Sequence, residues 1–356
     1  MDDFILYMLS NMSLKEKIGQ MIYIDYRKPN IKTTEMTAEF EEILSTFNPG
    51  GFILFTSNIS NLDNTYKLIN DIQSVSEIKM FIGVDQEGGR VQRLKDNIGF
   101  DSIIPARNVM DKEEAYLLGR RVGYELYYLG INMDMAPVLD IFSNPLNTVI
   151  GDRAYGSTSN EVSDKALYFA KGLMEEGIIP TGKHFPGHGS TSVDSHINMP
   201  TLYKTKEELY KLELIPFSDL INYGIPSIMV GHIMLPKIDS YPSTLSSRII
   251  TDILRKEMGF NGIVITDSLK MKGLTNYYNE YDIYYRCIAS GNDIMLMPKN
   301  IKSSIDTIYN AVNDGKISIE RINESVKRIL SLKYKMGLLD KESVLYNKKR
   351  KIIKRW

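Results

Sequence analysis

The reactive side chains of this chain are most concentrated between Lys183 and His196, where three of its four histidines lie. The same segment contains Asp194 and two glycines. The unperturbed pKa of histidine lies closest to neutral pH, so a cluster of this scarce residue beside a carboxylate indicates proton transfer. In Asp194-Ser195-His196 the carboxylate can fold back onto the ring, raise the pKa of the imidazole and fix its tautomer. This pair therefore has the make-up of a general acid/base.

A metal site is an alternative for the same histidines. His184 and His188 have the i, i+4 spacing of two ligands on a metal-binding helix. However, Pro186, Gly187 and Gly189 lie within or beside that span and disfavour a helix there. No glutamate follows the first histidine, and no second histidine pair occurs in the chain. We therefore predict no metal and no cofactor. The glycines instead favour a pliant loop that lets the backbone approach a ligand.

A second reactive carboxylate is expected at Asp267. It follows residues 263–266, an apolar run that is typical of a buried strand. A carboxylate held at the end of such a strand suits a nucleophile or a group that stabilises developing positive charge. The alternative is that Asp267 caps the helix that follows.

A third polar segment runs from Gly83 to Arg93 and has two adjacent glycines after an expected strand. It lacks the Gly-x-Gly-x-x-Gly and Gly-Lys-Ser/Thr patterns of phosphate-binding loops. Asp85 can accept and Arg93 can donate hydrogen bonds, so the two side chains can bracket the neutral hydroxyl groups of a ligand. Arg153, just past the fourth expected strand, can join this cluster. The alternative for these residues is a structural salt bridge.

Eight short apolar runs separated by amphipathic stretches must position these side chains. The expected helices have apolar residues three and four positions apart, and capping boxes begin at Ser13, Thr158 and Thr205. Strands joined through helices pair in parallel. The pattern therefore predicts a single-domain α/β fold, a (β/α)8 TIM-type barrel over residues 1–340, with a doubly wound open sheet as the alternative. The expected strands are residues 21–25, 51–55, 80–85, 132–140, 178–183, 227–232, 262–267 and 293–297.

Ionisable side chains mark six of the eight expected strand ends. In a (β/α)8 barrel the C-terminal ends of all strands open onto one face, where the active sites of this fold are built. We therefore expect these side chains to share one pocket, although each taken singly could be a strand terminator or a helix cap. They are Asp25, Asp85, Asp140, Lys183 with His184, His232 and Asp267.

The charge of the chain is nearly balanced, with 43 Lys and Arg against 44 Asp and Glu. A balanced charge exerts no global attraction on nucleic acid or anionic lipid, so we expect neither as a partner.

Acidic residues follow Met1 where a signal peptide would be basic, and no run of about 18 apolar residues occurs, which predicts a cytoplasmic protein. The single cysteine, Cys287, excludes an intramolecular disulfide and is expected in the core. The basic tail, residues 341–356, is expected to be a solvated terminus rather than a nucleic-acid or membrane contact.

Five motifs occur in a characteristic order along the chain, and together they span most of its length. They are Asp-Gln-Glu-Gly-Gly-Arg-Val at 85–91, Gly-Asp-Arg at 151–153, Lys-His-Phe-Pro-Gly-His-Gly at 183–189, Asp-Ser-His at 194–196 and Thr-Asp-Ser at 266–268. In these motifs the chain resembles glycoside hydrolase family 3, and specifically the β-N-acetylglucosaminidase branch of that family. The run at 183–189 together with 194–196 is the most specific part of the resemblance.

The resemblance implies a (β/α)8 barrel and a retaining, two-step mechanism. Asp267 would be the catalytic nucleophile that forms a covalent glycosyl-enzyme. His196, supported by Asp194, would be the acid/base in place of the second carboxylate that most glycosidases use. The residues implied to hold the sugar hydroxyls and the N-acetyl group are Asp85, Arg93, Arg153, Lys183 and His184, and His232 is expected near the same pocket.

The resemblance also implies an exo-acting enzyme that releases terminal β-linked N-acetylglucosamine, in bacteria usually from peptidoglycan fragments (muropeptides) during cell-wall recycling. Phosphorolysis is an alternative, because a histidine acid/base does not repel an anionic acceptor as a carboxylate would. The same residues would also fit a β-glucosidase on the same fold, a sugar-binding barrel without turnover, or a metal-dependent hydrolase.

Overall fold

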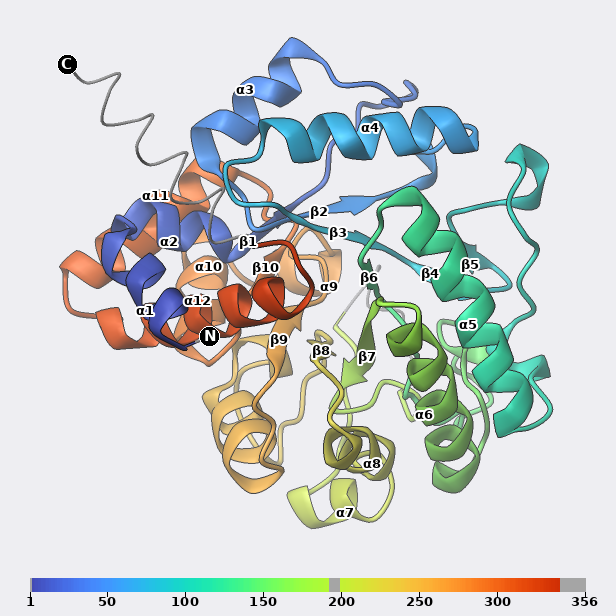
Figure 1. Cartoon of the computed structure of the whole chain (residues 1–356). Helices are drawn as coiled ribbons and strands as arrows, with labels where there is room; N and C mark the ends of the chain where they lie inside the picture. The colour runs from blue at the N-terminus through green and yellow to red at the C-terminus, as the bar shows by residue number, and fades with distance from the viewer. Residues whose placement is uncertain (1, 192–198, 340–356) are drawn as a thin grey trace, which may run out of the picture.

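The computed structural model describes residues 2–191 and 199–339 of the chain. Its eight parallel strands follow one another around a barrel in sequence order, and an isolated bridge between Ile265 and Ile294 joins the last two (Figure 1). All eight expected strands are present, and their ring closes, so the fold is the (β/α)8 barrel and not the open doubly wound sheet. The strands are β1 (Ile22–Ile24), β2 (Gly51–Leu54), β3 (Phe81–Val84), β6 (Met133–Asp134), β7 (Ile179–Phe185), β8 (Ser227–Val230), β9 (Ile263–Thr266) and β10 (Met295–Leu296).

A short antiparallel hairpin, which the sequence did not predict, follows β3 directly. It consists of β4 (Gln86–Gly88) and β5 (Val91–Gln92). Gly88 and Gly89 form its turn with φ values of 92° and 54°, and a Cβ at Gly88 would lie 2.4 Å from the carbonyl oxygen of Ile104. Only glycine fits so close an approach in this backbone conformation. The adjacent glycines therefore serve a hairpin that brings its own side chains to the strand ends.

The helices begin where local signals predict. Ser13, Thr158 and Thr205 each form a complete capping box, at the starts of α2 (Leu14–Gln20), α6 (Ser159–Glu175) and α7 (Lys206–Tyr210). These caps satisfy backbone amides that have no partner inside the helix. The other helices around the barrel are α3 (Ala38–Phe47), α4 (Leu62–Val75), α5 (Lys112–Leu129), α8 (Ile215–Tyr223), α9 (Lys272–Thr275), α10 (Glu280–Ala289), α11 (Ile301–Asn313) and a π-helix at Arg248–Glu257.

Helices α1 (Asp2–Asn11), α2 and α12 (Ile319–Lys335) lie at the N-terminal end of the barrel. Lys333 of α12 is fully buried, and its Nζ donates a hydrogen bond to Gln20 at 2.8 Å. The same Nζ lies 5.3 Å from the ring centre of Phe81, the first residue of β3. The helix expected at the end of the chain therefore crosses the starts of the strands, in front of the barrel as Figure 1 shows it.

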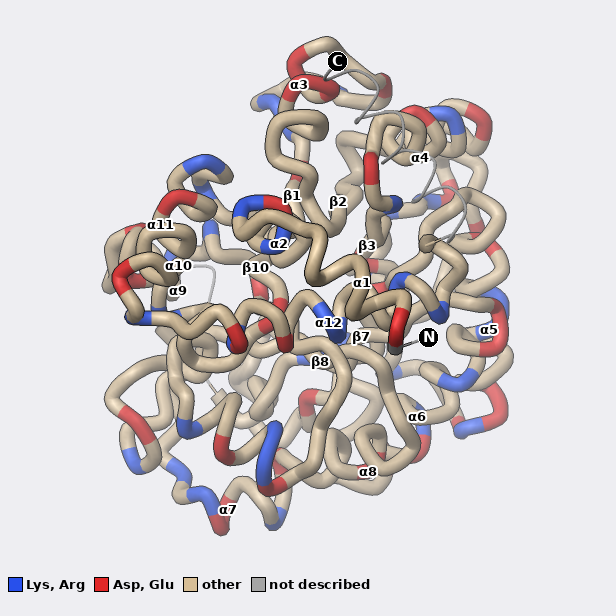
Figure 2. The backbone as a smooth tube through the Cα atoms, turned by 60° about the vertical axis from the view of Figure 1, so that its left-hand side comes forward, with Lys and Arg blue, Asp and Glu red and all other residues tan. Residues whose placement is uncertain are grey.

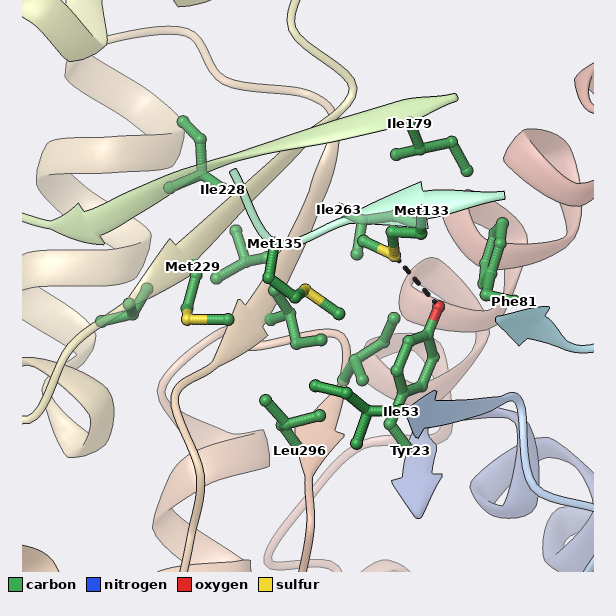
Figure 3. Packing of buried hydrophobic residues seen from close by; sticks show 14 of the residues in the cluster. Tyr23, Ile53, Phe81, Met133, Met135, Ile179, Ile228, Met229, Ile263 and Leu296 are labelled. Carbon is green, nitrogen blue, oxygen red and sulfur yellow. Dashed lines mark hydrogen bonds between the residues drawn. The ribbon is translucent and has the colours of Figure 1, made fainter. Parts of the chain in front are cut away.

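Large apolar side chains from the strands fill the barrel interior (Figure 3). Tyr23 of β1 points its hydroxyl at the sulfur of Met133 on β6, 3.5 Å away. Each such side chain, once fully buried, contributes roughly 1.5–3 kcal/mol to folding. A barrel filled in this way has no central pore, which leaves polar groups to the strand ends. The buried residues drawn there from the eight strands include Tyr23, Ile53, Phe81, Met133, Ile179, Met229, Ile263 and Leu296.

Acidic and basic residues are interspersed over the outer helices and loops, as Figure 2 shows, in keeping with the nearly balanced charge. Within residues 2–191 and 199–339, no helix has the length and apolar character needed to cross a membrane. Cys287 of α10 is completely buried, as a core residue should be. The basic tail at 341–356 lies outside the described residues.

Candidate active site

A cavity of about 300 Å³ lies at the C-terminal ends of the strands. The fold gathers side chains there that are up to 270 positions apart in the chain (27 to 297), as expected for a (β/α)8 barrel. Asp194 and His196 lie outside the described residues. Six of the predicted site residues line the cavity: Asp85, Arg93, Arg153, Lys183, His184 and Asp267.

Asp85, just past the end of β3, bridges two of the cavity's cations. Its Oδ1 accepts a hydrogen bond from Lys183 Nζ at 3.0 Å, and its Oδ2 accepts one from Arg93 Nη2 at 2.9 Å. Burial acts to raise the pKa of Asp85, but the charges of Lys183 and Arg93 outweigh burial and hold the pKa well below its ordinary value. Asp85 is therefore an ionised acceptor that can receive hydrogen bonds from a ligand but cannot donate one.

Glu87 of β4 is the partner that the sequence analysis did not assign. It is only 3% exposed and accepts two hydrogen bonds from Arg153, both of 2.7 Å, and an ion pair from Lys183 at 2.5 Å. Burial acts to raise its pKa, yet the charges of Arg153 and Lys183 lower that pKa to about 2. The sequence did contain a signal for Glu87. Arg93, Arg153 and Lys183 were predicted to form one cluster, in which Asp85 was the one carboxylate assigned to them, next to a Gly-Gly turn. Buried charges need counter-ions, so a further carboxylate was to be expected.

His184 is oriented by Asp140, which the sequence analysis noted only as a strand-end residue. Asp140 is completely buried, and its Oδ2 lies 2.7 Å from His184 Nδ1. Its Oδ1 accepts a hydrogen bond from the backbone amide of His188 at 2.6 Å. Burial acts to raise the pKa of Asp140, but the charge of His184 and its hydrogen bond lower it. An ionised Asp140 favours a proton on His184 Nδ1, which fixes how the ring faces the cavity.

His188 is a second residue that the sequence analysis left without a role in the site. It lines the cavity, is 3% exposed, and its Nδ1 lies 2.9 Å from Thr191 Oγ1. Burial lowers its pKa, so the ring is neutral at neutral pH. Its Nε2 is buried and has no hydrogen-bond partner in the described part of the chain. A buried polar atom that faces a cavity without a partner is a candidate to bind a ligand there.

Asp267 lies just past the end of β9, where the sequence predicted a fixed carboxylate. It is half-buried, lines the cavity, and its Oδ1 accepts a hydrogen bond from the amide of Ser268 at 2.7 Å. Burial acts to raise its pKa, but the positive potentials of His184, His232 and others outweigh burial and lower the pKa. An anionic carboxylate held by a strand end is what nucleophilic attack requires.

His232 does not line this cavity, in contrast to the other predicted sugar contacts. Its Nδ1 lies 2.6 Å from Thr244 Oγ1, and its Nε2 lies 2.9 Å from the carbonyl oxygen of Ser268. Both ring nitrogens are thus engaged by the protein. The structure therefore puts His232 in a supporting position, where it holds the turn that carries Asp267.

One rim of the cavity combines an aromatic ring with the cation Arg27. Arg27 and Phe55 both line the cavity, and the Arg27 guanidinium carbon lies 3.7 Å from the centre of the Phe55 ring. Asp25 pairs with Arg27 at 2.8 Å and with Lys270 at 2.6 Å. Two cations thus share one carboxylate, so this group of three side chains, of which Arg27 lines the cavity, has a net positive charge.

The described ranges 2–191 and 199–339 contain no group of three or more His, Cys, Asp or Glu side chains placed to hold a metal ion. The histidines instead face Asp140 and Thr191, as described above.

The similarity of this chain to known proteins extends over the whole barrel. A β-hexosaminidase of Idiomarina loihiensis is 39% identical over 276 residues, which cover 75% of this chain and 82% of that protein. β-Hexosaminidase A of Pseudoalteromonas piscicida is 31% identical over 91% of this chain, which spans only 62% of that longer protein. Among solved structures, a glycoside hydrolase family 3 β-N-acetylglucosaminidase from Paenibacillus sp. strain FPU-7 superposes with a TM-score of 0.87 at 32% identity, covering 94% of this chain and 67% of that one.

A glycosyl hydrolase of family 3 from Mycobacterium smegmatis, which is close to this chain in length, superposes with a TM-score of 0.82 at 28% identity and covers 91% of this chain and 98% of that one. The family model for the glycosyl hydrolase family 3 N-terminal domain matches residues 13–332, which includes every strand of the barrel and every described residue of the cavity. On this evidence the chain belongs to glycosyl hydrolase family 3.

Proposed function

We propose that this chain is a retaining exo-β-N-acetylglucosaminidase with Asp267 as its nucleophile. The observation that carries the proposal is an ionised carboxylate held by a strand end in a cavity whose other carboxylates are tied to cations. The cavity volume, about 300 Å³, lies at the small end of the range for ligand pockets and suits a single sugar unit. The names of its relatives, β-hexosaminidase and β-N-acetylglucosaminidase, support N-acetylglucosamine as that unit.

In the proposed first step, a carboxylate oxygen of Asp267 attacks the anomeric carbon and the bond to the leaving oxygen breaks. The leaving oxygen receives a proton from the acid/base. In the second step that group removes a proton from water, the water oxygen attacks the same carbon, and the bond to Asp267 breaks. Two inversions at one carbon retain the β configuration.

The carboxylates of the described cavity other than Asp267 are poorly suited to act as the acid/base. A general acid needs a pKa near the working pH. Asp85 and Glu87 do not meet this requirement, because the neighbouring cations lower both pKa values, that of Glu87 to about 2. This supports a histidine in the role, and we propose His196 with Asp194 as its partner. Thr191, the last residue of the first described range, contacts a cavity histidine through its hydroxyl, and Asp194 and His196 follow it by three and five positions in the sequence.

We further propose that the substrates are peptidoglycan fragments. In these the sugar next to N-acetylglucosamine is N-acetylmuramic acid, whose lactyl group is a free carboxylate in fragments that have lost the stem peptide. The Arg27 guanidinium on the cavity rim is suited to that carboxylate, and its stacking on the Phe55 ring helps to hold it in place. Arg27→Gln should lower kcat/KM about tenfold for N-acetylglucosaminyl-muramic acid and leave N,N′-diacetylchitobiose nearly unchanged. Equal losses on both disaccharides would contradict the proposed aglycone.

Hydrolysis is favoured over phosphorolysis by the pairing of the cavity's cations. In the described residues the cavity cations Arg27, Arg93, Arg153 and Lys183 are each bound to a carboxylate, so each attracts a phosphate less strongly than an unpaired cation would. A phosphorylase would release a sugar phosphate in phosphate buffer. The proposed enzyme should release the free sugar in phosphate and in Tris alike.

The test is hydrolysis of 4-nitrophenyl N-acetyl-β-glucosaminide in chelator-treated buffer by the parent and by Asp267→Asn. The variant should lose on the order of 10⁴-fold in kcat, as removal of a covalent nucleophile does. Asp306→Asn, which alters an exposed ion pair on α11, is the matched control and should keep full activity. The first product seen by NMR should be the β anomer. An α product, or an active Asp267→Asn, would refute the assigned nucleophile, and an inactive parent would point to a sugar-binding barrel.

A further inference from the structure

A second cavity lies at the opposite end of the barrel from the catalytic cavity. Its volume is about 730 Å³, larger than that of the catalytic cavity, and nineteen residues line it. One side consists of residues at or just before the starts of β7, β8 and β9, and the other side consists of α12. None of these residues belongs to the catalytic cavity, so the cavity needs a separate explanation.

The side formed by the strand starts is apolar. Ile178, Ile225 and Phe260 line it and are only 2–3% exposed. Gly224 and Gly259, which end the two preceding helices with φ of 99° and 71°, also line it. A Cβ at either glycine would meet no atom within 4 Å, so these turns leave the cavity open. The apolar side is therefore accessible to a ligand.

The side formed by α12 is positively charged. Its three ionisable lining residues, Lys327, Arg328 and Lys335, are all cations, and no acidic residue lines the cavity. Lys327, Ser331 and Lys335 are four positions apart and so share one face of the helix over about 12 Å. Arg328 pairs with Asp293 at 3.0 Å. In the described part of the chain, neither lysine forms an ion pair.

From this juxtaposition we propose that the cavity binds an anionic amphiphile, with its acyl chain on the strand starts and its carboxylate or phosphate on α12. The volume falls within the range of small-molecule sites, which are mostly apolar with a few placed polar groups. A protein partner is less well matched, because stable protein interfaces use about 20–30 residues on each side and bury well over 1,000 Å² in total. Because the α12 side is charged and the strand-start side is apolar, the head group of the ligand should lie on α12 and its acyl chain on the strand starts.

The experiment is calorimetric titration of the full chain with dodecanoate below its micellar concentration. One equivalent should bind, hexanoate should bind much more weakly because less apolar surface is buried, and dodecyltrimethylammonium should not bind. A parallel titration with dodecyl phosphate identifies which head group α12 prefers. Absence of dodecanoate binding, or equal binding of the cationic amphiphile, would overturn the proposal.

Three variants test the location of the site. Ser331→Trp should abolish dodecanoate binding by filling the cavity, and Lys327→Gln with Lys335→Gln should weaken it about fivefold or more. Lys211→Gln, which removes an exposed lysine at the end of α7, is the matched control and should bind like the parent. Hydrolysis of the aryl glycoside should be unchanged in all of them, which verifies folding. Binding that survives Ser331→Trp would refute the site, as would a dimer of the parent that this variant dissociates.

Discussion

Replacing Glu87 with glutamine should destabilise the protein strongly, because two buried cations share this carboxylate. Lys183 is 2% exposed and Arg153 is 11% exposed, and both contact Glu87 within 2.7 Å. Glutamine keeps the shape of the side chain but offers no charge, and its amide NH₂ would face a guanidinium. The change therefore leaves buried positive charge with one counter-ion fewer.

The magnitude follows from the pKa of Glu87. Burial acts to raise it, but Arg153 and Lys183 lower it from 4.5 to about 2. A shift of about 2.5 units at about 1.36 kcal/mol per unit corresponds to roughly 3 kcal/mol of stabilisation at neutral pH. Breaking a buried ion pair from one side costs about 3–5 kcal/mol, which agrees. We expect Glu87→Gln to lower the free energy of unfolding by about 3 kcal/mol.

Urea unfolding of the parent and variant, followed by circular dichroism, measures this difference from the midpoint at constant m-value. Because the pKa of Glu87 is lowered by folding, its contribution is complete above pH 4.5 and is lost as the pH falls towards 2. The difference between parent and variant should thus be the same at pH 7 and pH 6 and should shrink below pH 4.5. Glu39→Gln is the matched control, since it removes an exposed partner of Lys28 and should have little effect. A Glu87→Gln variant as stable as Glu39→Gln would refute the reasoning.

Three further predictions concern other parts of the barrel. His188→Ala should raise KM for the aryl glycoside about tenfold with little change in the unfolding midpoint, since the residue lines the cavity, its Nε2 has no hydrogen-bond partner within the described ranges, and one hydrogen bond is worth about 1–1.5 kcal/mol. Lys333→Met should raise the free energy of unfolding by about 1–4 kcal/mol, because burial lowers the pKa of this lysine and, among the described residues, its ammonium has a hydrogen bond to Gln20 but no ion pair. That gain should shrink as pH rises towards 10.5, where the unfolded state also loses the proton. Cys287 should react with Ellman's reagent only after unfolding, because burial raises the pKa of its thiol and no surface is exposed.

Local signals in the sequence were sufficient for the architecture. Short apolar runs with helical stretches between them predicted all eight strands, and the capping boxes at Ser13, Thr158 and Thr205 predicted three helix starts. These features are encoded within a few consecutive residues, so they can be recognised without knowledge of the fold. The hairpin β4–β5 was missed because its strands, Gln-Glu-Gly and Val-Gln, are mostly polar and lack the apolar run that marks the barrel strands.

Many of the residues of the site could also be predicted from the sequence. Once the strands are known, the barrel rule places their C-terminal ends on one face, and Asp85, Lys183, His184 and Asp267 do line one cavity. The rule states which end of a strand a residue occupies, but not whether its side chain points into the cavity. His232 is an example. It occupies an equivalent strand end, yet it lies outside the cavity lining and holds the backbone of the next turn.

The sequence by itself therefore determined the elements, their order and the residue types at the strand ends. Only the tertiary structure decided which groups pair. Glu87 binds Arg153 across 66 positions of the chain, and Lys183 binds Asp85 across 98. Ion pairing depends on the distance between charges in space, which is set when the barrel closes and not by separation along the chain. The same closure assigns Asp140 to His184 and thereby decides which ring faces a ligand.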